Sequence, residues 1–295
     1  MTHSGDGRGG RCGGGASTAG RQALVALAIV IVLALCRGSS RGLGAEVPPE
    51  QSPAITILVY HRFGPVVADS MTVTTPVFEW QLKYLREHGY TVVPLGDVVK
   101  FVKGQGHLPP RAVAITADDG HRTVFTVMRP LVERERIPVT LFIYPSAISN
   151  ASYAMTWEQL EALKATGLFS IQSHSYWHPN FHTEKKRLAA DAYRKLVETQ
   201  LTRARQVLER KLGSSAEMLA WPFGIYDDEL IAVAAKAGYV AAFTIDRRNV
   251  SANDNVMALP RYLMTDHDKG RAFAMILSGG DTEAAAARMR RSYQK

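Results

Sequence analysis

Segments typical of β-strands alternate with segments typical of α-helices from about residue 54 to residue 277 of this chain. Short apolar runs rich in β-branched residues indicate buried strands, and longer runs with apolar residues at helical spacing indicate helices. Such alternation favours a parallel sheet with crossover helices, either closed as a barrel or open. The predicted strands are residues 54–60, 90–95, 112–117, 139–144, 169–173, 218–221 and 239–245, and the predicted helices are residues 75–88, 97–103, 123–136, 156–166, 183–212, 227–237, 270–277 and 282–293.

Two helix starts carry recognisable capping signals. Thr75 precedes Pro76, which suits the first turn of a helix, so Thr75 is the expected N-cap of the helix over residues 75–88. Thr156 is followed three residues later by Gln159, the arrangement of a capping box. These signals predict where the two helices begin.

The N-terminal residues 1–45 have the pattern of an export signal. Several arginines precede 14 apolar residues, 23–36. A membrane-spanning helix needs about 20 apolar residues, whereas a basic start followed by a short apolar core is typical of a secretory signal peptide. We therefore expect an exported protein, periplasmic or extracellular, cleaved near Ala45. An uncleaved N-terminal anchor is the alternative, and lipidation of Cys36 is a minor one.

Cleavage near Ala45 would leave 250 residues, enough for one large domain, residues 46–295. Both cysteines, Cys12 and Cys36, would leave with the leader, so the mature protein would be stabilised by packing rather than by disulfides. The net charge would fall from +8 to +4 because the leader carries five arginines and one aspartate. No basic stripe interleaved with aromatic residues supports nucleic-acid binding.

Polar residues recur directly after the predicted strands. In a β/α barrel the carboxyl ends of all strands lie on one face, so side chains that are distant in sequence meet there. The residues in these positions are His61, Asp118, Asp119, His174, Trp221 and Asp246.

The adjacent carboxylates of Asp118 and Asp119 indicate either a metal site or a solvated turn, because two neighbouring charges repel unless a cation or separate partners stabilise them. His174 and His178 are four residues apart, on one helical turn or around a tight loop. Together with Asp119 they would give two nitrogens and one oxygen, with one position left for water, which is the open pattern of a catalytic zinc site.

These motifs resemble those of the polysaccharide deacetylases, the carbohydrate esterases of the nodulation-type chitooligosaccharide deacetylase superfamily. The first motif, Thr-Phe-Asp-Asp-Gly, corresponds to residues 116–120, and the second, His-Ser/Thr-x-x-His, to residues 174–178. The third, Arg-x-Pro-Tyr, corresponds to residues 220–223, where Ala220 replaces the arginine. Tyr60 and His61 look like the early Tyr-His pair of the branch that deacetylates poly-β-1,6-N-acetylglucosamine.

The resemblance implies a distorted (β/α) barrel and a set of site residues. Asp119, His174 and His178 would hold a divalent metal, with zinc preferred over cobalt or nickel. Asp118 would be the general base and His61 the general acid of amide hydrolysis. A backbone N–H near Phe223 would help to stabilise the oxyanion.

Several further residues are predicted to act at the site. Arg261 is expected to orient Asp118 in place of the missing motif arginine; an ordinary surface arginine is an equally good interpretation. Flat aromatic side chains near the strand ends are expected to stack on sugar rings, although packing in the core explains an aromatic residue more often. The predicted substrate-binding residues are Tyr144, Trp177, Trp221, Phe223 and Asp246.

The leading functional hypothesis is a metal-dependent hydrolase that removes N-acetyl groups from a β-linked N-acetylglucosamine polymer. The alternatives are a deacetylase of peptidoglycan, chitin oligomers or an O-acetylated glycan, and a non-catalytic glycan-binding or assembly protein. The expected partners are the acetylated polysaccharide and a polysaccharide export machinery, with a membrane tether if the leader is retained. A binding protein has no need for a base beside three metal ligands, which favours the enzyme.

Overall fold

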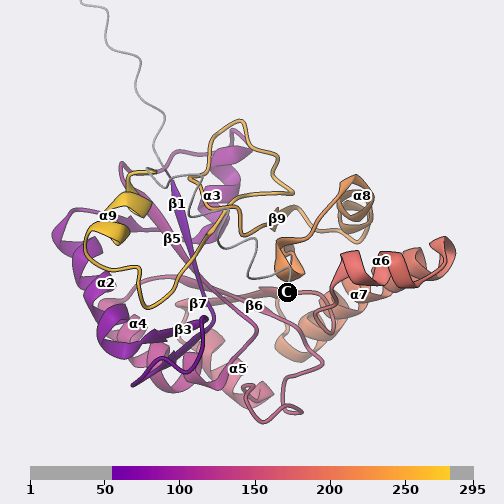
Figure 1. The fold of residues 1–295 in the computed structure, drawn as a ribbon, viewed down its shortest axis with the longest axis horizontal. Coiled ribbons are helices and arrows are strands. Elements are labelled where there is room, and N and C mark those ends of the chain that lie inside the picture. Colours follow the sequence, from indigo (N-terminus) through magenta and orange to yellow (C-terminus); the bar gives the residue numbers. More distant parts are fainter. Residues whose placement is uncertain (1–54, 280–295) are drawn as a thin grey trace, which may run out of the picture. The chain divides into compact units, whose positions relative to one another are not determined.

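The computed structural model describes residues 55–279, which form a curled parallel sheet surrounded by helices (Figure 1). Along the sheet the strand order is β10-β1-β5-β6-β7-β8-β9, and β4 pairs with the beginning of β5. All pairings within this sheet are parallel. The strands are β1 (Thr56–Tyr60), β4 (Thr91–Val92), β5 (Ala112–Asp118), β6 (Val139–Ile143), β7 (Phe169–Ser173), β8 (Met218–Ala220), β9 (Ala241–Phe243) and β10 (Tyr262–Leu263).

One extended segment links the two ends of the sheet. Leu259 forms a parallel bridge with Phe243 of β9, and three residues further on Tyr262 of β10 pairs with Leu58 of β1. The sheet is therefore curled into a distorted, irregularly closed barrel. The predicted fold class is confirmed. Of the barrel and the open sheet that the alternation allowed, the barrel form is observed.

Strand β5 lies at the centre of the sheet, and all seven of its residues are buried. It pairs with β1 on one side and with β6 on the other, so that Tyr60 lies opposite Ala117 and Asp118 lies opposite Phe142. Ile143 of β6 in turn lies opposite Ser173 of β7. This register brings the carboxyl ends of β1, β5, β6 and β7 to one edge, as the alternation predicts.

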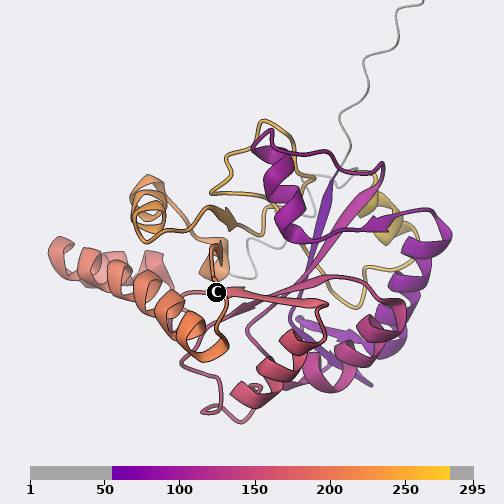
Figure 2. The same cartoon turned by 180° about the vertical axis from the view of Figure 1, so that it is seen from behind.

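Helices pack around the sheet on both sides, and Figure 2 shows the long α7 beside the strands from behind. The capping box of Thr156 and Gln159 is present at the start of α5, as predicted. The helical segments are α2 (Thr75–Glu87), α3 (Leu95–Val102), η1 (Val124–Met128), α4 (Arg129–Glu135), α5 (Trp157–Ala165), α6 (Phe181–Arg187), α7 (Ala190–Leu212), η2 (Pro222–Gly224), α8 (Asp228–Lys236) and α9 (Arg271–Leu277).

Three predicted elements differ from the structure. The single helix over residues 183–212 is two helices, because Leu188 adopts an extended backbone (φ −103°, ψ 150°) and packs against the apolar cluster around Phe181. The strand over residues 90–95 shrinks to β4 because α3 begins at Leu95, directly after Pro94. The helix over residues 123–136 begins as a π-helix, since Pro130 has no N–H to continue an α-helical ladder.

Smaller differences concern element ends. The N-cap of α2 is Thr74 rather than Thr75, and it makes no side-chain capping bond. The strand predicted over residues 239–245 is reduced to β9. Helix ends vary by a residue or two under any definition, but the cap geometry places α2 one residue earlier than predicted.

The sequence did not predict the small two-stranded parallel sheet of β2 (Arg62–Gly64) and β3 (Thr72–Thr74). It directly follows His61, and its connecting turn is held by Asp69, whose Oδ1 accepts from Met71 N at 2.9 Å. The predicted leader, residues 1–45, and the predicted helix over residues 282–293 lie outside the described residues. Within residues 55–279, no helix has the length and apolar character needed to cross a membrane.

Candidate active site

The carboxyl end of β5 separates the two adjacent aspartates. Asp118 is the last residue of the strand and is 2% exposed, whereas Asp119 adopts a left-handed backbone conformation (φ 71°). Gly120 follows with φ 71°, and a Cβ there would lie 3.0 Å from Ile148 Cδ1 and 3.1 Å from Ile143 Cδ1. Only glycine fits this turn without displacing its neighbours. The turn directs the two carboxylates to different partners.

The carboxyl end of β7 supplies the two histidines. His174 directly follows the strand, and a tight loop returns to His178, with positive φ values at Ser175 (62°) and His178 (60°). Non-glycine residues rarely adopt this conformation, and clusters of them are found at functional sites. Of the two arrangements that the sequence allowed, a helical turn or a tight loop, the loop is observed.

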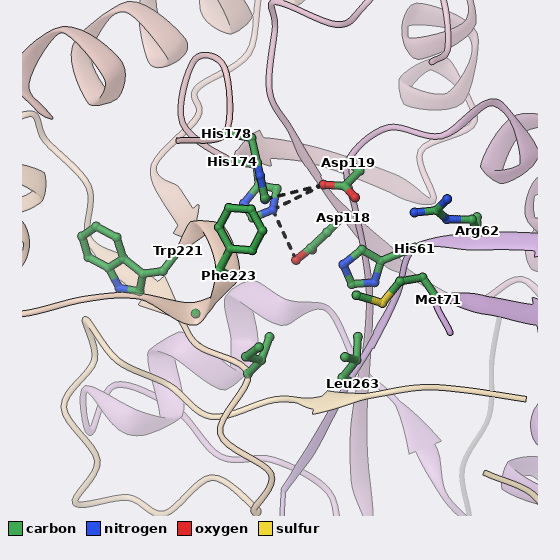
Figure 3. Close-up of a pocket in the computed structure, with 12 residues that line it drawn as sticks. His61, Arg62, Met71, Asp118, Asp119, His174, His178, Trp221, Phe223 and Leu263 are labelled. Atoms are coloured by element: carbon green, nitrogen blue, oxygen red, sulfur yellow. Dashed lines mark ion pairs between the residues drawn. The ribbon is translucent and has the colours of Figure 1, made fainter. Parts of the chain in front are cut away.

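Asp119, His174 and His178 each direct one potential ligand atom to a common point (Figure 3). Asp119 Oδ1 lies 3.6 Å from His174 Nε2 and 3.8 Å from His178 Nε2, and the three ligand atoms lie within 4.8 Å of one another. Within residues 55–279, the buried Asp119 Oδ1 has no hydrogen-bond partner. A buried carboxylate oxygen without a partner is costly, so these residues fit a bound cation.

The histidines are prepared to act as ligands. His174 Nδ1 lies 2.8 Å from Ala220 O, and donation of the Nδ1 proton to this carbonyl leaves the Nε2 lone pair directed at Asp119. Such a second hydrogen bond fixes the tautomer of metal-binding histidines. Burial, followed by the nearby His174, lowers the pKa of His178 to about 4, so its imidazole is neutral at pH 7. Two imidazoles and one carboxylate are ligands that zinc prefers.

Arg261 lies against Asp118 at the base of the site. Its Nη1 donates to Asp118 Oδ1 at 2.8 Å and its Nη2 donates to Asp118 Oδ2 at 2.7 Å, a bidentate pair. The guanidinium is fully buried, and its Nε donates to Thr244 O at 3.0 Å. Burial, the largest single effect, raises the pKa of Asp118, but the charge and hydrogen bonds of Arg261 together with the nearby His174 and His61 outweigh it and hold this pKa at about 2. Asp118 is therefore ionised throughout the physiological range.

His61 faces the two carboxylates from the side opposite His174 (Figure 3). It is 9% exposed, and its Nδ1 has no hydrogen-bond partner within the described part of the chain. Burial lowers the pKa of His61, and the charges of Asp119 and Asp118 act in the opposite direction. Once protonated, this imidazole is a stronger acid than histidine in water.

These residues line a cleft of about 200 Å³ that contains both aspartates and all three histidines. Two further lining residues, Trp221 and Phe223, were predicted as substrate-binding residues. The rest of the wall was not predicted, because it comes from the β2–β3 region, which the sequence did not predict, and from residues without polar chemistry. Arg62, which directly follows His61, is the one whose charge and position could have identified it. The unpredicted lining residues are Arg62, Met71, Gly224, Ile245 and Leu263.

The predicted aromatic residues lie in different surroundings. Phe223 and Trp177 are 40% and 42% exposed, and the Phe223 ring lies 4.6 Å from that of His178. The Tyr144 ring lies 5.4 Å from that of His178, and its hydroxyl pairs with that of Tyr153. Trp221 differs from them: it is fully buried, its Nε1 donates to Met257 O, and its indole points away from the histidines (Figure 3).

Asp246 does not line the cleft. Its carboxylate accepts from Thr244 Oγ1 at 3.1 Å, and its own N–H donates back to that hydroxyl. These local bonds are those of a turn-forming aspartate. The structure therefore brings together Asp118, Asp119, His61, His174, His178 and Arg261, but neither Asp246 nor the indole of Trp221 faces them.

Residues 105–242 match the polysaccharide deacetylase family. The chain thus contains a polysaccharide deacetylase domain, as its motifs predict, and it is an enzyme of the deacetylase class. Poly-beta-1,6-N-acetyl-D-glucosamine N-deacetylases of Staphylococcus aureus (strain MRSA252) and Staphylococcus epidermidis (strain ATCC 35984) are 25% and 24% identical to it over 199 residues. These alignments cover 66% of this chain and 68% of each relative.

Solved structures share the fold. The deacetylase PplD of Streptococcus pyogenes, determined in complex with acetate, superimposes with a TM-score of 0.68 at 19% identity, over 76% of this chain and 98% of that one. IcaB from Ammonifex degensii gives a TM-score of 0.65 at 22% identity, over 79% of this chain and 99% of that one. At this level of identity the likeness establishes the distorted barrel.

Proposed function

We propose that the protein is a metal-dependent N-deacetylase that acts on a β-linked N-acetylglucosamine polymer of the poly-N-acetylglucosamine type. The observation that carries this proposal is the pairing of Asp118 with the buried Arg261 beside three convergent metal ligands. A binding site for neutral sugars needs neither feature. The staphylococcal relatives, which are named for this polymer, support the choice of substrate.

Asp119, His174 and His178 would hold the metal, with zinc preferred because the site offers two imidazoles and one carboxylate. A divalent ion bound there would polarise the acetyl carbonyl and lower the pKa of water. Asp119 accounts for the negative charge of this ligand set. Its left-handed backbone turns its carboxylate toward the histidines and away from Arg261, so that Asp118 alone pairs with the arginine.

Asp118 is proposed as the general base that accepts the proton of the attacking water. Arg261 fixes both of its oxygens, so the carboxylate is held in one orientation beside His174 Nε2, 3.8 Å away. A fixed base avoids the entropic cost of being oriented during the reaction. Arg261 also keeps Asp118 ionised, at the cost of lowering its intrinsic basicity.

His61 is proposed as the general acid that protonates the departing amine. It lies across the cleft from His174, and its lowered pKa makes the imidazolium ready to release a proton. Water adds to the acetyl carbon, the C–N bond breaks, and the nitrogen takes up a proton, so acetate and a free amine are the products. Phe223, at the lip of the cleft with its N–H in the turn after β8, is proposed to assist the oxyanion and to contact the sugar.

We further propose that Tyr144, Trp177 and Phe223 contact sugar rings near the site, since all three have partly exposed faces around His178.

Export is proposed from the leader pattern of residues 1–45, and a polysaccharide export machinery is a proposed partner. The proposals of export and of an export machinery rest on the sequence pattern and on the substrate class.

The test is the release of acetate and the appearance of free amines on purified glycans, with and without a chelator, for the wild type and Asp118→Asn. We expect chelator-sensitive turnover of poly-β-1,6-N-acetylglucosamine that Asp118→Asn abolishes. Acetate released without new amines would indicate an O-deacetylase instead. Preferred turnover of chitin oligomers or peptidoglycan would reassign the substrate, and chelator-insensitive turnover would exclude the metal mechanism.

A further inference from the structure

Helix α7 carries a buried polar residue within its apolar face. Val197, Leu201 and Ala204 form this face, each at most 1% exposed, and Gln200 lies among them at 3% exposure. A buried amide without a hydrogen bond destabilises the fold. A glutamine at this position therefore needs a hydrogen-bond partner.

The partner of Gln200 belongs to the loop that carries the histidines. Gln200 Oε1 accepts a hydrogen bond from Trp177 N at 2.9 Å. Trp177 directly precedes His178, so the glutamine holds the Tyr176–Trp177 peptide, one peptide before this histidine. Helix α7 itself contributes no residue to the lining of the cleft.

The loop needs such support because its backbone is strained. Ser175 and His178 both have φ near +60°, a conformation that is unfavourable for residues other than glycine. Ser175 Oγ accepts from His178 N at 3.2 Å, and Tyr176 O accepts from Ser146 N at 3.1 Å. Helix α7 adds two further contacts: Gln200 accepts from Trp177 N, and the Arg203 guanidinium stacks on the Tyr176 ring at 4.1 Å.

We propose that Gln200 is a positioning residue that sets the metal affinity of the site by holding His178 in its ligating orientation. The inference rests on the proposed metal site and adds to it a residue 22 positions away from His178. Loss of the Gln200 acceptor removes the hydrogen bond of Trp177 N–H, so the loop relaxes away from the positive φ of His178. His174, fixed by Ala220 O, keeps its place.

The test is the Zn²⁺ affinity of the purified protein, measured by competition with a chromophoric chelator, together with the visible spectrum of the Co²⁺ form. Gln200→Met removes the acceptor and keeps the shape of the side chain, whereas Gln200→Glu retains an oxygen at the same reach. Outer-shell changes typically weaken metal binding by about 10–100-fold. We expect Gln200→Met to weaken Zn²⁺ binding about tenfold and to change the Co²⁺ bands, and Gln200→Glu to stay close to wild type.

Gln172, in strand β7, offers a matched control. It is also buried, and its Oε1 also accepts from a backbone N–H, that of Met218 at 2.8 Å, but it braces β7 against β8 rather than the histidine loop. Gln172→Met should lower the melting temperature about as much as Gln200→Met and leave Zn²⁺ affinity unchanged. A loss of affinity that merely follows stability would therefore appear in both variants.

The outcomes separate this inference from the proposed function. If the wild type binds no Zn²⁺, both are overturned. If the wild type binds Zn²⁺ and Gln200→Met binds it equally well, the positioning role is wrong and the metal site stands. Equal losses in Gln200→Met and Gln200→Glu, or in Gln172→Met, would also overturn it. Should Gln200→Met not fold, Gln200→Leu provides a second acceptor-free variant for the same comparison.

Discussion

Residues 55–279 contain two buried arginine–aspartate pairs near β10, and of these only the pair of Arg261 with Asp118 has its carboxylate in the lining of the cleft. Arg261 binds Asp118 through two hydrogen bonds, and Asp118 lies 3.8 Å from His174. Arg247 donates to Asp268 Oδ1 at 3.1 Å and to Leu263 O at 2.9 Å, and Asp268 Oδ2 accepts from both Thr265 N and Thr265 Oγ1. The chemistry of the two pairs is similar, but their surroundings differ.

The surroundings decide what each pair does. Asp268 is engaged by its own loop, and its backbone oxygen accepts from Gln81, whose Oε1 accepts from Tyr60. This network ties α2, β1 and the segment after β10 together behind the site. Asp118 instead ends a central strand whose carboxyl edge opens into the cleft. Of the two paired carboxylates, that of Asp118 lines the cleft, and Asp118 is the one proposed as the base.

Replacement of the two aspartates should give the largest difference between the pairs. Asp118→Asn removes the proposed base and should lower kcat by about a thousandfold, within the usual range for loss of general acid–base catalysis. Asp268→Asn should leave kcat close to wild type while lowering stability. Steady-state amine release per folded enzyme checks both values. Similar losses of kcat in the two variants would mean that Asp118 stabilises the fold but does not act as the base.

Removal of either arginine should destabilise the fold by a similar amount. Arg261→Met leaves Asp118 buried without its partner, and Arg247→Met does the same to Asp268. Breaking a buried pair in this way costs about 3–5 kcal/mol. Urea unfolding measures the change in the free energy of unfolding, and activity is then compared at equal folded fraction. Only Arg261→Met should also lose activity; normal turnover by this variant would remove Arg261 from the proposed mechanism.

Zinc should stabilise the protein through the site and not through the second pair. A ligand at 100 times its Kd raises the free energy of unfolding by about 2.7 kcal/mol. We expect Zn²⁺ to raise the melting temperature of the wild type and of Asp268→Asn, but not that of His178→Ala. Thermal unfolding with and without Zn²⁺ measures the shift. A full shift in His178→Ala would place zinc elsewhere in the molecule.

The smallest effect is expected far from both pairs. Thr156→Ala removes the N-cap of α5, where Thr156 accepts from Gln159 N at 3.3 Å. Loss of such a cap costs about 1 kcal/mol. The variant should unfold at a slightly lower urea concentration and keep wild-type kcat and KM. This variant therefore shows how much a small loss of stability by itself changes turnover.

The sequence predicted the site where local pattern and chemistry coincide. An apolar run directly before Asp118 and Asp119 identifies a buried strand that delivers two carboxylates, and β7 delivers His174 in the same way. Both strands are found where predicted. The pattern could not say where a side chain turns: Trp221 follows a strand as predicted and lines the cleft, yet its indole turns to Met257 and away from the histidines.

By itself, the sequence determined the order of the main strands and helices apart from β2, β3 and β10, the residues at the strand ends and the class of chemistry they support, because these follow from periodicity and from side-chain type. Only the tertiary structure decided that Arg261 reaches Asp118 across 143 residues, that Ala220 contributes its carbonyl to His174, and that Gln200 supports the histidine loop. These contacts join segments with no local relation in sequence. They exist because the parallel register brings the strand ends to one edge, where buried polar atoms must find partners.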